Sequence, residues 1–332
     1  MAYLEIELVI IISFFVSFGI TFSIIPFLMK YLKKKGITGI DIHKPNKPEI
    51  PEMGGLAILT GLILTSILVL FLLDQYVQEI LTFICIILIA GFVGIYDDKK
   101  GLGPEKKAII LIFACIPLLY FGVITPRPLL PIIGRTRLTI IYWVALLLAI
   151  TVPANAVNML DVLNGSMSIT CIIVSVALLI CAILLDSTIG ILFSLLLLGA
   201  LIAFLIFNKY PAKIFSGNVG SFTVGAAIGI IAVIGRLEIA AIIALMPHIM
   251  NSFYILASVG GLKGRTQIKK RPIIILPDGK LTANPDQDAP LTLTRLILAR
   301  GPLTEAEIVK IFAIISIVSA ILAILSVVIT PK

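Results

Sequence analysis

Long apolar runs, each close to the length that a helix needs to cross a lipid bilayer, follow one another along almost the whole of this 332-residue chain. A helix requires roughly 20 predominantly apolar residues to span the hydrocarbon core. Hydrophobic residues make up 59% of the chain and charged residues only 13%, against about 25% charged in soluble domains. Because no soluble core could hide so much apolar surface, the sequence predicts an all-α, polytopic integral membrane protein.

Reading these runs by length places about ten membrane-spanning helices along the chain. Their ranges are near 7–31, 55–73, 79–96, 107–124, 138–157, 166–185, 189–207, 220–235, 238–260 and 303–330. The range 220–235 is short and rich in glycine, which predicts close contact with neighbouring helices. Without a clear repeat or a long linker, residues 1–332 are predicted to form a single membrane domain with a cytoplasmic loop at about 261–302.

Lys and Arg are divided unevenly between the two sets of loops. If the first span runs from outside to inside, the inward loops hold most of the cations behind the net charge of +8. The outward segments keep only Arg127, Arg135, Arg137, Arg236 and Lys332. Since cytoplasmic loops carry the excess of Lys and Arg, the long loops are predicted to be cytoplasmic and both termini to lie outside. The same asymmetry argues against a nucleic-acid partner, which would require a basic soluble face.

The first apolar run is predicted to remain in the protein instead of being cleaved as a signal peptide. It is preceded by Glu5 and Glu7 instead of a basic segment, and it exceeds the length of a signal core.

Two adjacent carboxylates end the third predicted span, in the tract Gly94–Lys100. Asp97 and Asp98 are followed ten residues later by Lys107. Neighbouring carboxylates attract a hard cation, or serve as a base and its electrostatic partner. A solvated helix end followed by a positive-inside cluster would give the same pattern, and the tract alone leaves both interpretations open.

A second polar tract interrupts the apolar region near residue 160. Asn155 and Asn158 are three residues apart, as are Asp161 and Asn164, so each pair would share a helix face before the chain reaches Gly165. One or two such amides are typical of hydrogen bonding between membrane helices. A run of four polar side chains favours a site.

Three further segments on the same predicted face carry polar residues. In 208–221, glycines flank Asn218 at the start of a span, an arrangement that suits an anion or a simple turn and helix cap. The proline-rich first loop, 41–55, contains Lys44. The last loop contains Lys263, Arg265, Lys269, Lys270 and Arg271. This cluster suits phosphate or anionic lipid headgroups, although an ordinary positive-inside loop explains it equally well.

Taken in order, these tracts resemble the polyprenyl-phosphate N-acetylhexosamine-1-phosphate transferase family, of the glycosyltransferase family 4 type. The resemblance extends from about Asp41 to Leu281 through five separated motifs. Its details look most like the branch of the dolichyl-phosphate GlcNAc-1-phosphate transferases and their archaeal counterparts. These details are Asn208, Tyr210-Pro211, Phe215, Gly217, Pro272 and Gly279-Lys280-Leu281. Bacterial phospho-MurNAc-pentapeptide translocases typically carry a histidine cluster in the last loop, which has no histidine here.

The resemblance implies a reaction dependent on Mg²⁺, with Mn²⁺ as an alternative. A lipid phosphate oxygen would attack the β-phosphorus of UDP-GlcNAc or a related UDP-sugar, giving a polyprenyl- or dolichyl-diphospho-sugar and UMP. This step initiates lipid-linked glycan assembly. The expected partners are therefore the UDP-sugar, the polyprenyl or dolichyl phosphate and membrane lipids, with a homodimer also compatible. The expected location is the cell membrane, with the active site facing the cytoplasm.

Matching motif positions assign roles to the acidic and basic residues. Asp97 is expected to act as the base or orienting acid at the acceptor phosphate, with Asp98 beside it. Lys107 would contact the donor diphosphate, and Lys44 lies in a loop associated with catalysis. Cations of the last loop would neutralise the donor phosphates, although the family's Arg-His-Arg pattern is absent. These cations are Arg265, Lys269, Lys270 and Arg271.

The amide-rich tract and Asn218 receive the remaining roles. Asn158 matches a magnesium-ligand position, Asn164 lies where the family contacts uracil, and Asn155 and Gly165 flank them as substrate-binding candidates. Asn218 departs from the family, which normally has a magnesium-binding Asp there. An amide oxygen still ligates a hard cation but brings no negative charge. Three accounts stay open: Asp161 compensates, the chain is a natural low-activity variant, or the substitution was introduced to trap an inactive state.

Two other functions compete with this enzyme. A catalytically silent scaffold of the same family would follow if Asn218 had removed the metal site. A transporter would favour ionisable residues near the middle of the bilayer and paired repeats. Here the acids and amides lie toward the cytoplasmic ends of the predicted spans, which favours the transferase.

Overall fold

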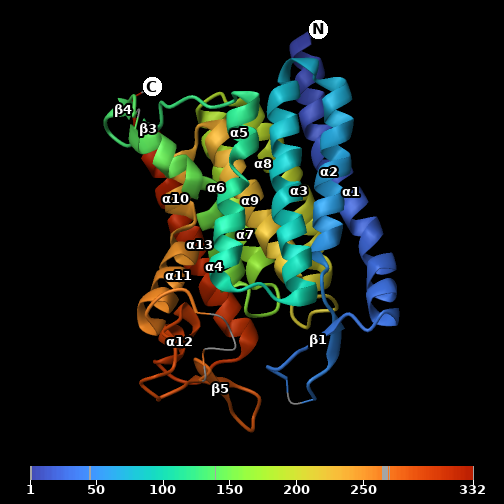
Figure 1. Cartoon of the computed structure of the whole chain (residues 1–332), viewed down its shortest axis with the longest axis vertical. Helices are drawn as coiled ribbons and strands as arrows, with labels where there is room; N and C mark the ends of the chain where they lie inside the picture. The colour runs from blue at the N-terminus through green and yellow to red at the C-terminus, as the bar shows by residue number, and fades with distance from the viewer. Residues whose placement is uncertain (1, 45, 139, 264–267, 269, 332) are drawn as a thin grey trace.

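The computed structural model describes residues 2–44, 46–138, 140–263, 268 and 270–331. Over these ranges the chain folds into an upright bundle of helices with three short hairpins at its ends (Figure 1). The helices are α1 (Ala2–Lys34), α2 (Gly55–Leu72), α3 (Val77–Lys100), α4 (Pro104–Phe113), α5 (Ile116–Phe121), α6 (Ile140–Leu160), α7 (Ser166–Leu184), α8 (Thr188–Asn208), α9 (Gly217–Gly235), α10 (Glu238–Ala244), α11 (Met246–Val259), α12 (Leu293–Leu298) and α13 (Glu305–Val328).

The predicted all-α, polytopic class is confirmed. Within the described ranges, eight helices are long and apolar enough to cross a membrane, and the bent pair α10–α11 makes nine if it forms one span. The pair bends by 65° just before Pro247, where a proline ring would disrupt a continuous helix. The run predicted at 107–124 is also broken, into α4 and α5, which follow one another along the bundle in Figure 1. Two of the roughly ten predicted spans are therefore broken helices.

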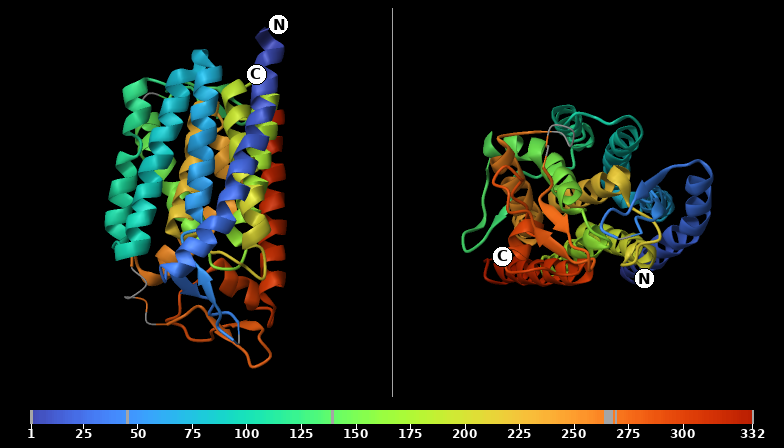
Figure 2. Two further views of the ribbon diagram at one scale, coloured as in Figure 1. Left: turned by 90° about the vertical axis from the view of Figure 1, so that its right-hand side faces the viewer. Right: turned by 90° about the horizontal axis from the view of Figure 1, so that it is seen from below.

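The two ends of the bundle differ. One end, which we call the loop face, carries the β1–β2 hairpin (Thr38–Ile40 and Glu49–Pro51), residues 209–216 and residues 261–302. The opposite end, the terminal face, carries both chain termini (Figure 2) and the β3–β4 hairpin (Leu129–Leu130 and Gly134–Arg135), which is labelled in Figure 1. The prediction that both termini lie on one side agrees with this arrangement.

The predicted loop at 261–302 has regular structure of its own. Strands β5 (Ile273–Ile275) and β6 (Leu281–Ala283) pair in antiparallel register, with Ile274 opposite Thr282. Helix α12 follows, and Arg295 on it donates hydrogen bonds to the carbonyl oxygens of Asn284 and Asp286 at 3.1 and 2.7 Å. These bonds lie within the loop, and the backbone N–H of Leu293 attaches it to the bundle by donating to Oδ1 of Asn251 on α11 at 2.9 Å.

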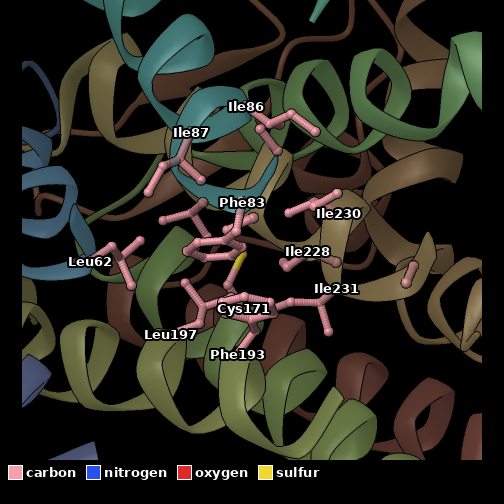
Figure 3. Close-up of a cluster of buried hydrophobic side chains, with 14 of the residues drawn as sticks. Leu62, Phe83, Ile86, Ile87, Cys171, Phe193, Leu197, Ile228, Ile230 and Ile231 are labelled. Atoms are coloured by element: carbon pink, nitrogen blue, oxygen red, sulfur yellow. The ribbon is translucent and has the colours of Figure 1, made fainter. Parts of the chain in front are cut away.

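Helix α9 occupies the centre of the bundle and packs against α2, α3, α6 and α8. Of its most apolar 18 residues, 83% are buried, the largest share among the eight span-length helices. Its neighbours supply large apolar side chains: Phe83 of α3 and Phe193 of α8 stack with ring centroids 4.2 Å apart in the cluster of Figure 3. The close approach predicted from the glycines of 220–235 is therefore present.

Glycines set how closely the other helices approach α9. A Cβ atom added to Gly225 would lie 2.5 Å from both the Cα atom of Ala154 and the carbonyl oxygen of Pro153 on α6. One added to Gly94 on α3 would lie 2.4 Å from the Cα atom of Val219. Small residues allow such backbone contact in membranes, where packing must replace the hydrophobic driving force between helices.

We expect Gly225→Ala to lower the free energy of unfolding by about 1–3 kcal/mol, because the new methyl group overpacks the α6–α9 contact. Gly19→Ala on α1 is the matched control, since a Cβ atom there meets nothing within 4 Å. Thermal unfolding of the purified variants in detergent compares them. Equal melting temperatures for the two variants would contradict the close approach.

Candidate functional site

Most of the polar residues predicted to form a site meet at the loop face, around the end of α3, the end of α6 and the start of α9. Asp98 makes the central contact. Its Oδ1 accepts the backbone N–H of Asn218 at 2.8 Å, and its Oδ2 accepts that of Val219 at 3.1 Å. A carboxylate here satisfies otherwise unpaired amides and interacts favourably with the positive end of the helix dipole.

The turn that delivers Asn218 to Asp98 depends on Gly217. This residue adopts φ +67, a left-handed conformation that glycine tolerates best. A Cβ atom on it would also lie 2.7 Å from Oδ2 of Asp98. The glycine therefore allows the carboxylate to reach the helix terminus.

The side chain of Asn218 points toward α6. Asn158 donates from Nδ2 to Oδ1 of Asn218 at 2.6 Å and to Oγ of Ser221 at 2.8 Å. The two amides predicted as metal ligands are thus direct neighbours. These hydrogen bonds join α6 to α9, so hydrogen bonding between helices is present, and the predicted site stays a prediction.

Asp161, one residue beyond α6, accepts a hydrogen bond from the Ser216 hydroxyl. Burial raises the pKa of its carboxyl group to about 6, and the negative charges of Asp98 and Glu52 contribute. Glu52 follows strand β2 and was not singled out from the sequence, where it is one acid among the charges of a proline-rich loop. Three carboxylates and two amides therefore gather here: Glu52, Asp98, Asp161, Asn158 and Asn218. We call this group the acidic cluster.

Asp97 is paired with a lysine, whereas Asp98 beside it accepts hydrogen bonds from the start of α9. The Asp97 carboxylate lies 2.5 Å from Nζ of Lys107 on α4, and only 2% of its side chain is exposed. The other oxygen accepts the backbone N–H of Leu102 at 2.6 Å. Asp97 and Lys107, predicted as an acid and a phosphate contact, thus form an ion pair beside the acidic cluster.

Lys44 and Asn164 belong to a third group of contacts. Lys44 forms an ion pair with Asp41, donates to Oδ1 of Asn164 at 3.3 Å and lies 5.0 Å above the ring of Tyr210. Asn164 is 4% exposed, and its Nδ2 donates to Glu305 at 2.5 Å and to Asp41 at 3.2 Å. This connects the first loop, the end of α6 and the start of α13.

The amide of Asn164 is fully hydrogen-bonded. Its Oδ1 also accepts the backbone N–H of Ala212 at 2.7 Å, and its backbone N–H donates to Glu305 at 2.6 Å. Glu305 was not found from the sequence. The capping box formed by Thr304 and Glu307 marks the start of α13, but it gives no sign that Glu305 accepts hydrogen bonds from the turn between α6 and α7.

Asn155 and Gly165 lie at the two ends of the amide-rich tract. Asn155 donates to the carbonyl oxygen of Thr151 at 2.9 Å, one turn back along α6. Gly165 precedes α7 with φ +78 and would place a Cβ atom 3.3 Å from the Cα atom of Lys209. The glycine permits the contact between this turn and residues 209–216.

The cations of the last loop are only partly described. Lys270 lies 2.5 Å from Asp286 and 3.0 Å from Asp288, whose hydrogen bonds raise the pKa of its amino group. Arg271 is exposed. The pKa of His43 in the first loop is lowered mainly by burial, and the positive charge of Arg271 contributes to the shift. The last loop therefore lies near the first. Arg265 and Lys269 lie outside the described residues.

The acidic cluster has the chemistry of a site for a hard divalent cation. Its donors are carboxylate and amide oxygens, and the pKa of Asp161 is raised mainly by burial, with the charges of Asp98 and Glu52 adding to the shift. Among the described residues, no group of three or more His, Cys, Asp or Glu side chains is arranged to hold a metal. Proteins usually bind Mg²⁺ through one or two carboxylates together with substrate phosphates, so a magnesium site here would need a bound substrate to complete it.

Comparison with known proteins relates this chain to a family of transferases. Residues 80–236 match the model of glycosyl transferase family 4. Two archaeal relatives carry the name UDP-N-acetylglucosamine–dolichyl-phosphate N-acetylglucosaminephosphotransferase. That of Saccharolobus solfataricus is 33% identical over 93% of this chain and 92% of its own length, and that of Sulfolobus acidocaldarius is 32% identical over 91% of each. A phospho-N-acetylmuramoyl-pentapeptide-transferase of Halalkalibacterium halodurans is 29% identical over 78% of this chain and 85% of its own.

We expect Lys107→Met to destabilise the protein by about 3 kcal/mol, because it leaves the Asp97 carboxylate buried without its cation. Lys106→Met is the matched control, since Lys106 is exposed and forms no ion pair with any residue that the structure describes. The double variant Asp97→Asn with Lys107→Met should regain most of the stability. Thermal unfolding in detergent measures all three, and equal effects of the two single lysine variants would refute the pairing.

Proposed function

The chain belongs to glycosyl transferase family 4, and we propose that its loop face transfers GlcNAc-1-phosphate from UDP-GlcNAc to a polyprenyl or dolichyl phosphate. As a family member it is a multi-pass membrane enzyme of the sugar-1-phosphate transferase type. The observation that carries the proposal is the acidic cluster beside the Asp97–Lys107 ion pair, at the end of the membrane-spanning helices. There a water-soluble donor meets a lipid acceptor.

The reaction joins two anions, so positioning and charge neutralisation dominate it. An oxygen of the lipid phosphate forms a bond to the β-phosphorus of UDP-GlcNAc. The bond from that phosphorus to the bridging oxygen breaks, and UMP leaves with the electron pair. Asp97 orients the acceptor phosphate or takes its remaining proton. Lys107 then contacts the donor diphosphate while staying close to Asp97.

Loop cations and amides position the donor in this proposal. Lys44 is held by Asp41 and Asn164 and is 5.0 Å from the ring of Tyr210, so its charge has a defined place beside the site. Arg271 of the last loop lies near the first loop, whereas Lys270 beside it is paired with Asp286 at 2.5 Å and would have to leave that partner to reach the donor. Because Asn164 is fully hydrogen-bonded, a contact between it and uracil would replace one of its present hydrogen bonds.

Asn158, Asn218, Asp98 and Asp161 would hold Mg²⁺ or Mn²⁺ in this proposal. A bound divalent cation supplies neutralisation of the charge that develops on the transferred phosphoryl group. Asp98 additionally fixes Asn218 through the backbone of α9, so it positions a ligand as well as contributing charge. Asn218 contributes an oxygen without a charge, which weakens the binding of a hard cation.

The sugar, the lipid and the orientation rest on the relatives and on charge. The two archaeal relatives are named for UDP-N-acetylglucosamine and dolichyl phosphate, which supports these substrates here. The described ends of the predicted cation-rich loops lie on the loop face, so the positive-inside rule supports an active site facing the cytoplasm of the cell membrane. Entry of the acceptor tail between helices would explain why the enzyme has many spans. A homodimer, which the family resemblance allows, forms part of the proposal.

An activity assay tests the proposed reaction directly. Purified protein incubated with radiolabelled UDP-GlcNAc, Mg²⁺ and a polyprenyl phosphate should release UMP and give a labelled lipid, with both products lost after chelation of the metal. A parallel reaction with UDP-MurNAc-pentapeptide should be slower. Faster transfer from that donor would assign the chain to the peptidoglycan branch, and no product from either donor would support a silent scaffold.

We expect Asn218→Asp to lower the Mg²⁺ concentration needed for half-maximal turnover by about tenfold, because it adds a negative charge to the ligand set. Asn155→Asp serves as the control. It adds the same charge on α6, one turn before Asn158, where the amide of Asn155 donates to the carbonyl oxygen of Thr151 in its own helix. Mg²⁺ titrations of initial rates compare the variants. Unchanged metal dependence in Asn218→Asp, or an equal shift in the control, would contradict Asn218 as a ligand.

A further inference from the structure

A cavity of about 470 Å³ opens on the terminal face, at the opposite end of the bundle from the acidic cluster. Its walls come from the starts of α3 and α8, the end of α9 and the segment that follows α5. Figure 1 shows these elements together at the end that carries both termini. The proposed transfer reaction uses none of its residues.

Arginines are concentrated in this cavity. The sequence leaves few cations on the terminal face, yet Arg127, Arg135 and Arg236 all line this one hollow. Each is exposed. Within the part of the chain that the structure describes, none has a carboxylate within ion-pair distance. Arg236 donates to Oγ1 of Thr125 at 3.3 Å, which directs its guanidinium group toward the segment after α5.

The remaining lining completes a polar site. Glu79 and Asp186 bring two carboxylates, so three guanidinium groups outnumber them by one. Gln78, Ser187 and Thr188 add hydrogen-bonding groups. Guanidinium groups bind phosphate through paired, charge-assisted hydrogen bonds. The acids would accept hydrogen bonds from hydroxyl or amino groups on the same ligand.

We propose that this cavity binds a phosphate ester, through Arg127, Arg135 and Arg236, on the face opposite the catalytic site. Two sources provide that chemistry, a soluble phosphate and the headgroup of an anionic phospholipid. A second hollow shares Leu129, Leu185 and Arg236 with the cavity and continues along apolar side chains of α10 and α13, including Ile239 and Val327. That second hollow has a volume of only about 10 Å³, which is too small for an acyl chain, so the surroundings favour neither source.

Binding measurements on the full-length protein in detergent test the site. One arm measures the melting temperature in sodium phosphate against sodium chloride of equal ionic strength. The other counts bound phosphatidylglycerol by native mass spectrometry, with phosphatidylcholine as the comparison lipid. Arg127→Gln and Arg236→Gln should each weaken binding by about tenfold, the effect of losing one charged hydrogen-bonding group. Arg137→Gln is the matched control, because Arg137 is exposed on the same segment but does not line the cavity.

The two measurements distinguish a soluble phosphate from a lipid headgroup, and each has an outcome that contradicts the proposal. Stabilisation by phosphate alone indicates a soluble ligand, and selective retention of phosphatidylglycerol indicates a lipid. The proposal is overturned if wild-type protein binds neither probe, if both cavity variants bind normally, or if Arg137→Gln loses as much binding as they do. None of these readouts depends on transferase activity, so they stand apart from the test of the proposed function.

Discussion

The hydrogen bonds that Asp98 accepts from the start of α9 are the contact on which the loop face depends. They fix the end of the most deeply buried helix against the end of α3, and so determine where Asn218 lies. From Asn218 the contacts continue to Asn158 on α6. The glycines along α3 and α9 make this possible, since a side chain at Gly94 would separate the two backbones.

Much of the fold could be predicted, because crossing a membrane imposes length and polarity on each helix separately. Broken helices were the exception: Pro117 and Pro247 begin new helices inside runs that hydropathy reads as continuous. Composition cannot distinguish a straight span from a broken one. The break depends on whether neighbouring helices satisfy the backbone groups that a proline releases.

The candidate site was predictable where its residues form short local patterns, as Asp97-Asp98 and the amide-rich tract do. Their partners were harder to find. Glu52 and Glu305 are single acids near the ends of unrelated elements, and only the packing of distant segments gives them neighbours. The pairing of Asp97 with Lys107, and not with the cluster beside it, likewise depends on where α4 lies. The catalytic or metal-binding role of each of these residues stays a prediction.

The hydrogen bonds that Glu305 accepts from Asn164 also bear on biosynthesis. Glu305 opens the last long helix, whereas Asp41 and Lys44 emerge among the first fifty residues, so this network closes only after nearly all of the chain has been made. An unfinished chain in the membrane would hold its polar loop residues without their final partner. The site would therefore mature last, and a nascent protein would meet substrate only once its whole bundle had assembled.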